Sequence, residues 1–232
     1  MMESATPFDL LPLEGCFDPG EDSYRIGIID IGSNTVRMVV YDAPARLPVP
    51  IFNERAICAL GKGLDITGHL DPVGKELAFE ALLRFCGLAN EMKVGQFRIL
   101  ATAAVRDAKD GPAFAKEVEK RFGYAVKILS GKEEAHLGAR GILGGQPNAD
   151  GLFGDIGGGS LDLVLLNTGK FGDSDTLPLG HLRITEAAEG SLKKAQKIID
   201  NNLSTVKWLS KIEGRNFYAV GGIWRVIARI YI

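Results

Sequence analysis

The stretch Gly154–Ser160 reads GDIGGGS and lies between two apolar runs, Gly151–Phe153 and Leu161–Leu166. This pattern predicts a strand, a tight glycine turn and a returning strand. Three successive glycines can adopt positive φ and let the backbone approach a ligand, so that their N–H groups converge on a phosphate oxygen. The acids that flank the turn, Asp155 and Asp162, suit a bound cation or a positioned water. An ordinary glycine-rich hairpin explains the same residues equally well.

The chain repeats this pattern near its start. Residues 29–40 read IDIGSNTVRMVV, and they match residues 154–165, GDIGGGSLDLVL, position for position in residue type. Each copy has Asp-Ile-Gly, two small residues, a hydroxyl and an apolar strand. A hairpin needed only for structure would not have to repeat its acid, its glycine and its hydroxyl. We therefore predict two phosphate-binding turns in two similar domains, facing each other across a cleft.

Composition limits the partners of such a cleft. The 232 residues are 46% hydrophobic and 24% charged, which is enough for a sizeable core in one large or two small domains. The net charge of -2 gives no electrostatic reason to expect nucleic acid, and no membrane partner is expected.

The three cysteines, Cys16, Cys58 and Cys86, are odd in number and lack metal-site spacing, so a reduced, cytoplasmic protein is predicted. Residues 1–23 do not resemble a secretory signal and are expected to be a flexible extension.

Apolar periodicity predicts strands that alternate with helices, hence an α/β architecture. We expect a first domain over residues 24–145 and a second over residues 146–232. The expected strands are Arg25–Asp30, Thr35–Tyr41, Ile51–Leu60, Phe97–Ala101, Ala125–Leu129 and Phe217–Val220, and the expected helices are Pro72–Met92, Ala103–Ala108, Pro112–Phe122 and Ser191–Ile212.

Ser130-Gly131-Lys132-Glu133 fits a helix capping box, in which Glu133 has a structural task. Glu134 projects about 100° further round the helix and is not used by that cap, so it is available for chemistry. The alternative for Glu134 is a solvated surface glutamate. His181 is interpreted as a loop histidine, since no paired acid or nucleophile is spaced beside it.

Six motifs in order resemble those of the Ppx/GppA phosphatases, the exopolyphosphatases and guanosine pentaphosphate phosphohydrolases. The motifs are Asp30–Thr35 (DIGSNT), Ala101–Arg106 (ATAAVR), Ser130–Ala135 (SGKEEA), Asp155–Ser160 (DIGGGS), Leu177–Gly180 (LPLG) and Val220–Gly222 (VGG). The resemblance implies the actin, Hsp70 and sugar kinase fold, with two ribonuclease H-like domains and an active site between them assisted by Mg²⁺.

Carried over by position, the resemblance makes Glu134 the base that activates an attacking water. Asp155 and Asp162 become acidic companions near the water or the metal, although the family often has glutamate where this chain has Asp162. The residues implied to hold phosphates are Gly32, Ser33, Asn34, Thr35, Arg106, Gly157, Gly158, Gly159 and Ser160. The planar fork of Arg106 suits phosphate oxygens.

Members of this family usually continue well past the motif that corresponds to Val220–Gly222. The second domain is therefore expected to be truncated, and its uncovered apolar surface is expected to favour a homodimer. The leading hypothesis is a hydrolase that removes terminal phosphate from inorganic polyphosphate or guanosine pentaphosphate. The alternatives are an actin-like ATPase or sugar kinase, and a non-catalytic binder or sensor of phosphorylated nucleotide. The sequence does not distinguish the two substrates, because both carry a terminal phosphoanhydride.

Overall fold

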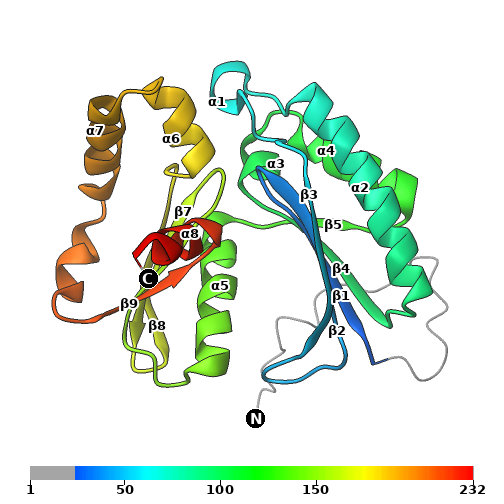
Figure 1. Cartoon of the computed structure of the whole chain (residues 1–232), viewed down its shortest axis with the longest axis horizontal. Helices are drawn as coiled ribbons and strands as arrows, with labels where there is room; N and C mark the ends of the chain where they lie inside the picture. Colours follow the sequence, from blue (N-terminus) through cyan, green and yellow to red (C-terminus); the bar gives the residue numbers. More distant parts are fainter. Residues whose placement is uncertain (1–23, 232) are drawn as a thin grey trace, which may run out of the picture.

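The computed structural model describes residues 24–231; the expected flexible extension and Cys16 lie outside the described residues. Strands and helices alternate and form two sheets with helices packed on them (Figure 1). The strands are β1 (Ile26–Ile31), β2 (Thr35–Tyr41), β3 (Pro50–Ile57), β4 (Gln96–Ala101), β5 (Val126–Ile128), β6 (Gly151–Ile156), β7 (Leu161–Asn167), β8 (Lys170–Leu177) and β9 (Asn216–Val220). The helices are α1 (Leu64–Thr67), α2 (Pro72–Glu91), α3 (Ala103–Asp107), α4 (Gly111–Phe122), α5 (Gly131–Gly145), α6 (His181–Ala188), α7 (Leu192–Leu203), the 3-10 helix η1 (Lys207–Ile212) and α8 (Gly222–Tyr231).

Each sheet begins with the antiparallel hairpin that the repeated sequence predicts. The strand orders are β3-β2-β1-β4-β5 and β8-β7-β6-β9. In the first sheet β1 runs antiparallel to β2 and parallel to β4, and in the second β6 has the same relation to β7 and β9. Asp30 and Asp155 occupy equivalent places near the ends of β1 and β6, where they lie opposite Arg37 and Asp162 respectively. The sequence repeat is therefore a structural repeat.

The first sheet buries one face against α2 and α4 (Figure 1). Ile29, Val36 and Met38 point to that side and are fully buried. They share one core with Phe85 of α2 and Phe114 of α4. Alternate residues of the strands pack on the apolar faces of the two helices. The turn that joins β1 to β2, with its polar residues, therefore lies beyond this core.

The second sheet is covered on both faces. Phe153 and Val164 pack with Ala139 of α5 on one side. Leu152 and Leu163 pack on the other side with partly buried side chains of α6, α7 and η1. Because both faces of this sheet are covered, β6 and β7 are buried almost continuously, whereas burial alternates along β1 and β2.

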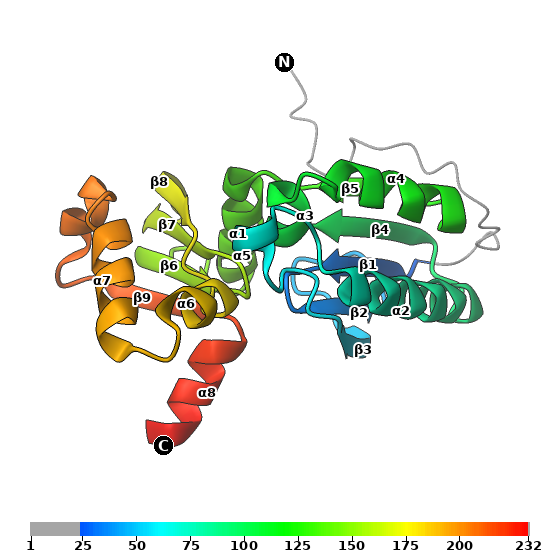
Figure 2. The same cartoon turned by 90° about the horizontal axis from the view of Figure 1, so that it is seen from above.

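Helix α5 belongs by its contacts to the second sheet, although the sequence grouped residues 131–145 with the first domain. It packs against β6, β7 and β8 and lies between the two sheets (Figures 1 and 2). Small residues make this approach possible, since a Cβ at Gly138 would lie 2.6 Å from Phe153 and one at Gly131 would lie 2.6 Å from Thr176. A face of small residues carries little hydrophobic signal, so the sequence pattern did not indicate which sheet it contacts.

Three further expectations need correction. β3 ends at Ile57 rather than Leu60, because the N–H groups of Cys58 and Ala59 leave the sheet to donate to the Asn34 carbonyl. The single helix expected over residues 191–212 is two, α7 and η1, separated at residues 204–206 by the buried Val206. His181 is the first residue of α6 and not part of a loop. Across residues 24–231, none of the helices is long and apolar enough to cross a membrane.

Candidate active site

The two predicted turns have the same internal geometry. The N–H of Gly32 donates to the Thr35 carbonyl at 2.9 Å, and the N–H of Gly157 donates to the Ser160 carbonyl at 2.9 Å. The turns also meet each other directly, since Gly158 and Gly159 lie against Ser33. Folding therefore brings the two phosphate-binding candidates into contact, whereas the sequence predicted turns separated by a cleft.

Two glycines of the second turn, Gly158 and Gly159, are needed for space rather than for unusual backbone angles. None of Gly157–Gly159 adopts the positive φ that three successive glycines can take, and Gly32 does not adopt it either. A Cβ at Gly159 would instead lie 2.5 Å from the Ser33 hydroxyl, and a Cβ at Gly158 would lie 3.1 Å from the Ser33 Cβ. Side chains at these positions would push the two turns apart.

Neighbouring segments hold the carbonyls of both turns. In the first turn, Ser33 O accepts from Gly61 N, and Asn34 O accepts from Cys58 N and Ala59 N. In the second turn, the carbonyls of Gly157 and Gly158 accept from the first two N–H groups of α6. Within residues 24–231 no hydrogen bond uses the N–H groups of Ser33, Asn34, Gly158 or Gly159. Successive free N–H groups of this kind form an anion-binding surface.

His181 helps to anchor the second turn. Its Nδ1 lies 2.9 Å from the Gly157 carbonyl, and its backbone N–H donates to the same oxygen at 3.1 Å. Gly180, just before it, packs on the turn so closely that a Cβ would lie 2.3 Å from Gly158 O. The His181 side chain thus contacts the backbone of the second turn.

The start of α5 separates the tasks of its two glutamates, as the sequence predicts. The Ser130 hydroxyl accepts from Glu133 N at 3.3 Å, and a Glu133 carboxylate oxygen accepts from Ser130 N at 2.9 Å. This backbone hydrogen bond, with Lys127 beside it, lowers the pKa of Glu133 to about 2. Glu134 takes no part in the cap; its side chain is 21% exposed, and it accepts from Arg106 Nη1 at 2.7 Å.

Four carboxylates influence one another's protonation at the junction of the two sheets. Burial, with repulsion from Glu134, raises the pKa of Asp162 to about 7 and that of Asp30 to about 6. Burial also raises the pKa of Asp155 and of Glu134, and the ion pair with Arg106 opposes the shift at Glu134. Groups whose pKa values are displaced together in this way favour a functional site.

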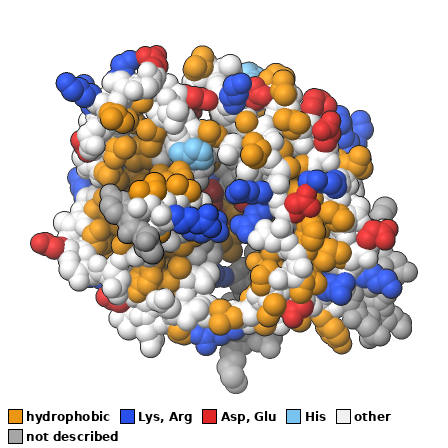
Figure 3. Space-filling view, viewed as in Figure 1, with side chains coloured by type: hydrophobic (Ala, Val, Ile, Leu, Met, Phe, Trp, Pro, Cys, Tyr) orange, Lys and Arg blue, Asp and Glu red, His pale blue; other side chains and the backbone are white. Residues whose placement is uncertain are grey.

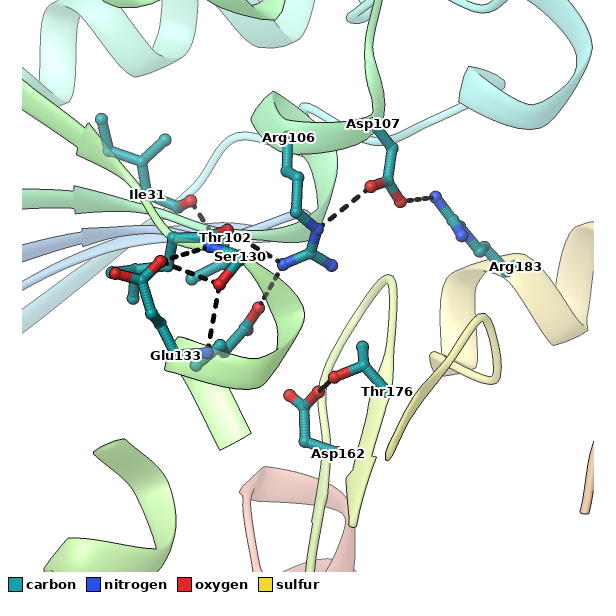
Figure 4. A network of polar contacts seen from close by, with 11 residues as sticks. Ile31, Thr102, Arg106, Asp107, Ser130, Glu133, Asp162, Thr176 and Arg183 are labelled. Carbon is teal, nitrogen blue, oxygen red and sulfur yellow. Dashed lines mark hydrogen bonds and ion pairs between the residues drawn. The ribbon is translucent and has the colours of Figure 1, made fainter. Parts of the chain in front are cut away.

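Asp30 is not among the site residues that the sequence predicts. Part of its surface is open to solvent, but protein surrounds it closely enough that desolvation dominates its pKa. The signal was present in the repeat, because Asp30 is the counterpart of Asp155. Asp162 is buried, with 4% of its surface exposed, and accepts from the Thr176 hydroxyl at 2.7 Å (Figure 4).

Arg106 connects the carboxylates to a second arginine. Its Nε donates to Asp107 Oδ1 at 3.2 Å, and Asp107 Oδ2 accepts from Arg183 of α6 at 2.6 Å (Figure 4). Asp107 and Arg183 are not predicted from the sequence, because only folding brings α3 and α6 together.

Beside these groups is a pocket of about 250 Å³. Its lining residues come from both halves of the chain and are Arg106, Asp107, Gly131, Ser160, Thr176, Leu177, Pro178 and Arg183. The surface is hollowed between the two halves, and Lys and Arg side chains gather around the opening (Figure 3).

The donor set suits a hard cation, but the side chains do not form a complete cage. In the described part of the chain, no three His, Cys, Asp or Glu residues are grouped closely enough to hold a metal by themselves. Mg²⁺ is commonly bound by one or two carboxylates, several waters and substrate phosphates, so this arrangement fits it. Asp155 and Asp162, with Asp30 nearby, are the oxygen donors available.

Comparison with known proteins gives the same relationship as the motifs. A model of the Ppx/GppA phosphatase family matches residues 39–229. The chain is 30% identical over 173 residues to Exopolyphosphatase 2 of Mycobacterium tuberculosis, a match that covers 70% of this chain and 54% of that protein. The chain therefore spans about half the length of this relative.

Solved structures agree in fold. An exopolyphosphatase from Cytophaga hutchinsonii superimposes with a TM-score of 0.80 at 23% identity, covering 89% of this chain and 69% of that one. The Ppx/GppA family member of Aquifex aeolicus superimposes with a TM-score of 0.68 at 25% identity, covering 85% and 66%. These likenesses confirm the predicted α/β fold of the actin, Hsp70 and sugar kinase class. Because the family model spans most of the sequence, the chain belongs to the Ppx/GppA phosphatase family.

Proposed function

We propose that this protein is a phosphoric anhydride hydrolase that releases the terminal phosphate of inorganic polyphosphate. The observation that carries the proposal is the position of Glu134. It is largely buried, has no part in the helix cap and is held by Arg106, close to two turns with free N–H groups. Guanosine pentaphosphate is the second candidate substrate, because its terminal phosphoanhydride has the same chemistry.

In the proposed reaction the free N–H groups of Ser33, Asn34, Gly158 and Gly159 bind the terminal phosphate. The oxygen of a water attacks its phosphorus in line, the bond from that phosphorus to the bridging oxygen breaks, and the shortened chain leaves with the bonding electrons. Glu134 accepts a proton from the water. Its raised pKa suits this task, because a base is most effective when its pKa approaches the working pH.

The remaining predicted residues have supporting roles. Arg106 fixes Glu134 and stabilises the charge on the transferred phosphoryl group. Gly32, Thr35, Gly157 and Ser160 form the closing hydrogen bonds of the turns. Asp155 and Asp162 would hold Mg²⁺, which when bound neutralises phosphate charge. We place the boundary between the two domains near Ser130, so that α5 carries Glu134 on the second domain.

Two properties of the whole protein are part of the proposal. We infer a cytoplasmic setting from the cysteines, since Cys58 and Cys86, the two in the described residues, are both free. We also infer a homodimer, because α8 exposes apolar side chains: Val226 is 58% exposed and Ile230 is 75% exposed.

The test is phosphate release by the purified chain from long-chain polyphosphate, guanosine pentaphosphate and ATP, with Mg²⁺ and with EDTA. We expect release from polyphosphate in Mg²⁺ and little in EDTA. Transfer of phosphate to an added sugar would favour the kinase alternative. Tight binding of guanosine pentaphosphate without release from any substrate would favour the non-catalytic sensor and contradict the proposal.

A further inference from the structure

Arg183 is a cation of the second half of the chain that lies against acids of the first half. Its Nη2 is 2.6 Å from Asp107 Oδ2, and its Nε is 3.3 Å from Asp65 Oδ1. Its side chain is only 15% exposed, so it is not a mobile surface arginine. Burying an arginine requires compensation by charge, and both acids supply it.

Asp107 is shared between two arginines. One of its oxygens faces Arg106 Nε at 3.2 Å and the other faces Arg183 Nη2. Each guanidinium still has donors to spare, because no hydrogen bond among residues 24–231 uses Arg106 Nη2 or Arg183 Nη1. Asp107 is thus shared by two positive charges that both line the 250 Å³ pocket, and Glu134 and Asp65 each add a second carboxylate to one of them.

The pocket extends the proposed phosphate site instead of forming a separate one. Ser160 of the second turn and Gly131, at the start of the helix that bears Glu134, line it together with Arg183. Its volume is below the roughly 300–1,000 Å³ typical of pockets for drug-sized ligands, so it suits small anionic groups better than a nucleoside.

We propose that Arg183 is a substrate-binding residue that binds the phosphates following the terminal one. In the absence of substrate, the carboxylate of Asp107 accepts the hydrogen bonds that these phosphates would otherwise accept from Arg183. The inference rests on the proposed phosphate-releasing function. Each additional phosphate of a linear chain brings negative charge and oxygens that a guanidinium can bind in pairs. A bound chain would take over the donors that Asp107 now occupies, and the site would then favour polyphosphates of three or more units over a single phosphate.

The test measures equilibrium binding of inorganic orthophosphate and of tripolyphosphate by calorimetry, in EDTA to prevent turnover. Arg183→Gln removes the charge and keeps a hydrogen-bonding side chain of similar length. We expect its Kd for tripolyphosphate to rise about 10-fold or more, the factor for a lost charge-assisted hydrogen bond, with orthophosphate binding within about twofold of the wild type.

Arg84→Gln is the matched control. Arg84 also forms an arginine–carboxylate pair, at 2.6 Å to Glu54, but does not line the pocket. Its loss should leave both dissociation constants unchanged. Asp107→Asn gives an independent variant: removing the acid that competes with phosphate should tighten tripolyphosphate binding by a few fold.

Three results would overturn the inference. The first is an unchanged Kd for tripolyphosphate in Arg183→Gln, and the second is an equal loss of affinity for orthophosphate and tripolyphosphate, which would mean that Arg183 only holds the two halves together. The third is weaker tripolyphosphate binding in Asp107→Asn. If Arg183→Gln does not fold, Arg183→Lys keeps the charge without the fork and should show a smaller, chain-length-dependent loss. A wild-type protein that binds tripolyphosphate but releases no phosphate would refute the proposed function and leave this inference standing.

Discussion

Two adjacent glutamates with different environments give the sharpest test at the scale of single residues. Glu134→Gln keeps the size of the side chain and its contact with Arg106, but it cannot accept a proton. Turnover of polyphosphate should fall by about 100-fold or more, the usual contribution of a general base, with KM nearly unchanged. Steady-state phosphate release at several polyphosphate concentrations measures both quantities.

Glu133→Gln is the internal control. Its amide oxygen can still accept from Ser130 N, and the residue lies away from Arg106. The variant should lose the ion pair with Lys127 and keep its rate. Equal damage from the two substitutions would mean that Glu134 is not the base.

The raised pKa of Asp162 leads to a prediction of how the free energy of unfolding depends on pH. Its pKa is raised to about 7, chiefly by burial, so the folded state holds the proton more tightly than the unfolded state does. Between the ordinary aspartate value and about 7 the unfolded chain loses the proton first, so the free energy of unfolding should fall as pH rises through this window. The raised pKa of Asp30, about 6, acts in the same direction.

Thermal unfolding in EDTA at pH 5 and pH 8 checks this expectation. Asp162→Asn keeps an acceptor for Thr176 and cannot ionise, so it should reduce the loss of Tm between the two pH values and raise Tm at pH 8. The pKa of Glu133 is lowered to about 2, so its contribution changes below pH 5 and does not affect this comparison. The assignment would be contradicted if the Tm of the wild type changed between pH 5 and pH 8 in the same way as the Tm of Asp162→Asn.

At the scale of elements, the contact between the two turns is the feature to perturb. Gly159→Ala places a Cβ 2.5 Å from the Ser33 hydroxyl and 3.0 Å from the Ala103 Cβ, so the turn or these neighbours must shift. Overpacking of this kind destabilises by about 1–3 kcal/mol. Gly157→Ala has the same chemistry, but its Cβ would meet only Ser160 O at 3.8 Å.

Chemical unfolding of both variants distinguishes contact from backbone conformation. We expect a lower midpoint for Gly159→Ala and little change for Gly157→Ala. If both lose the same stability, glycine is needed for its backbone freedom and the observed contact is unimportant. Combining Gly159→Ala with Ser33→Gly should recover part of the loss, because the obstructing hydroxyl is removed.

For the whole molecule, the exposed face of α8 predicts association. Val226, Ile227 and Ile230 present apolar surface on one helix. We expect the purified chain to form dimers, and Ile230→Lys to shift the population toward monomer without changing the far-ultraviolet circular dichroism. Light scattering over a range of protein concentrations measures the shift. A wild-type protein that is monomeric at every concentration would refute the homodimer.

Local pattern in the sequence was enough for the fold class, the repeated hairpins and the capping box. These depend on short-range rules: apolar runs in the strands of residues 26–41, glycine turns, and a Ser–Glu pair three residues apart. The same rules distinguished Glu134 from Glu133, since one turn of helix determines which glutamate can reach back to the cap. The family relationship also followed from the order of the motifs.

Only the tertiary structure decided which parts meet. Small residues on α5 place that helix on the second sheet, and no apolar pattern in the helix indicated this. Gly158 and Gly159 are required by close contact with Ser33, a residue more than 120 positions away in sequence, rather than by their own φ angles. The pKa shifts of Asp30 and Asp162 and the Arg106–Asp107–Arg183 chain likewise arise from burial and proximity between distant segments, which are properties of the folded chain and not of any local stretch.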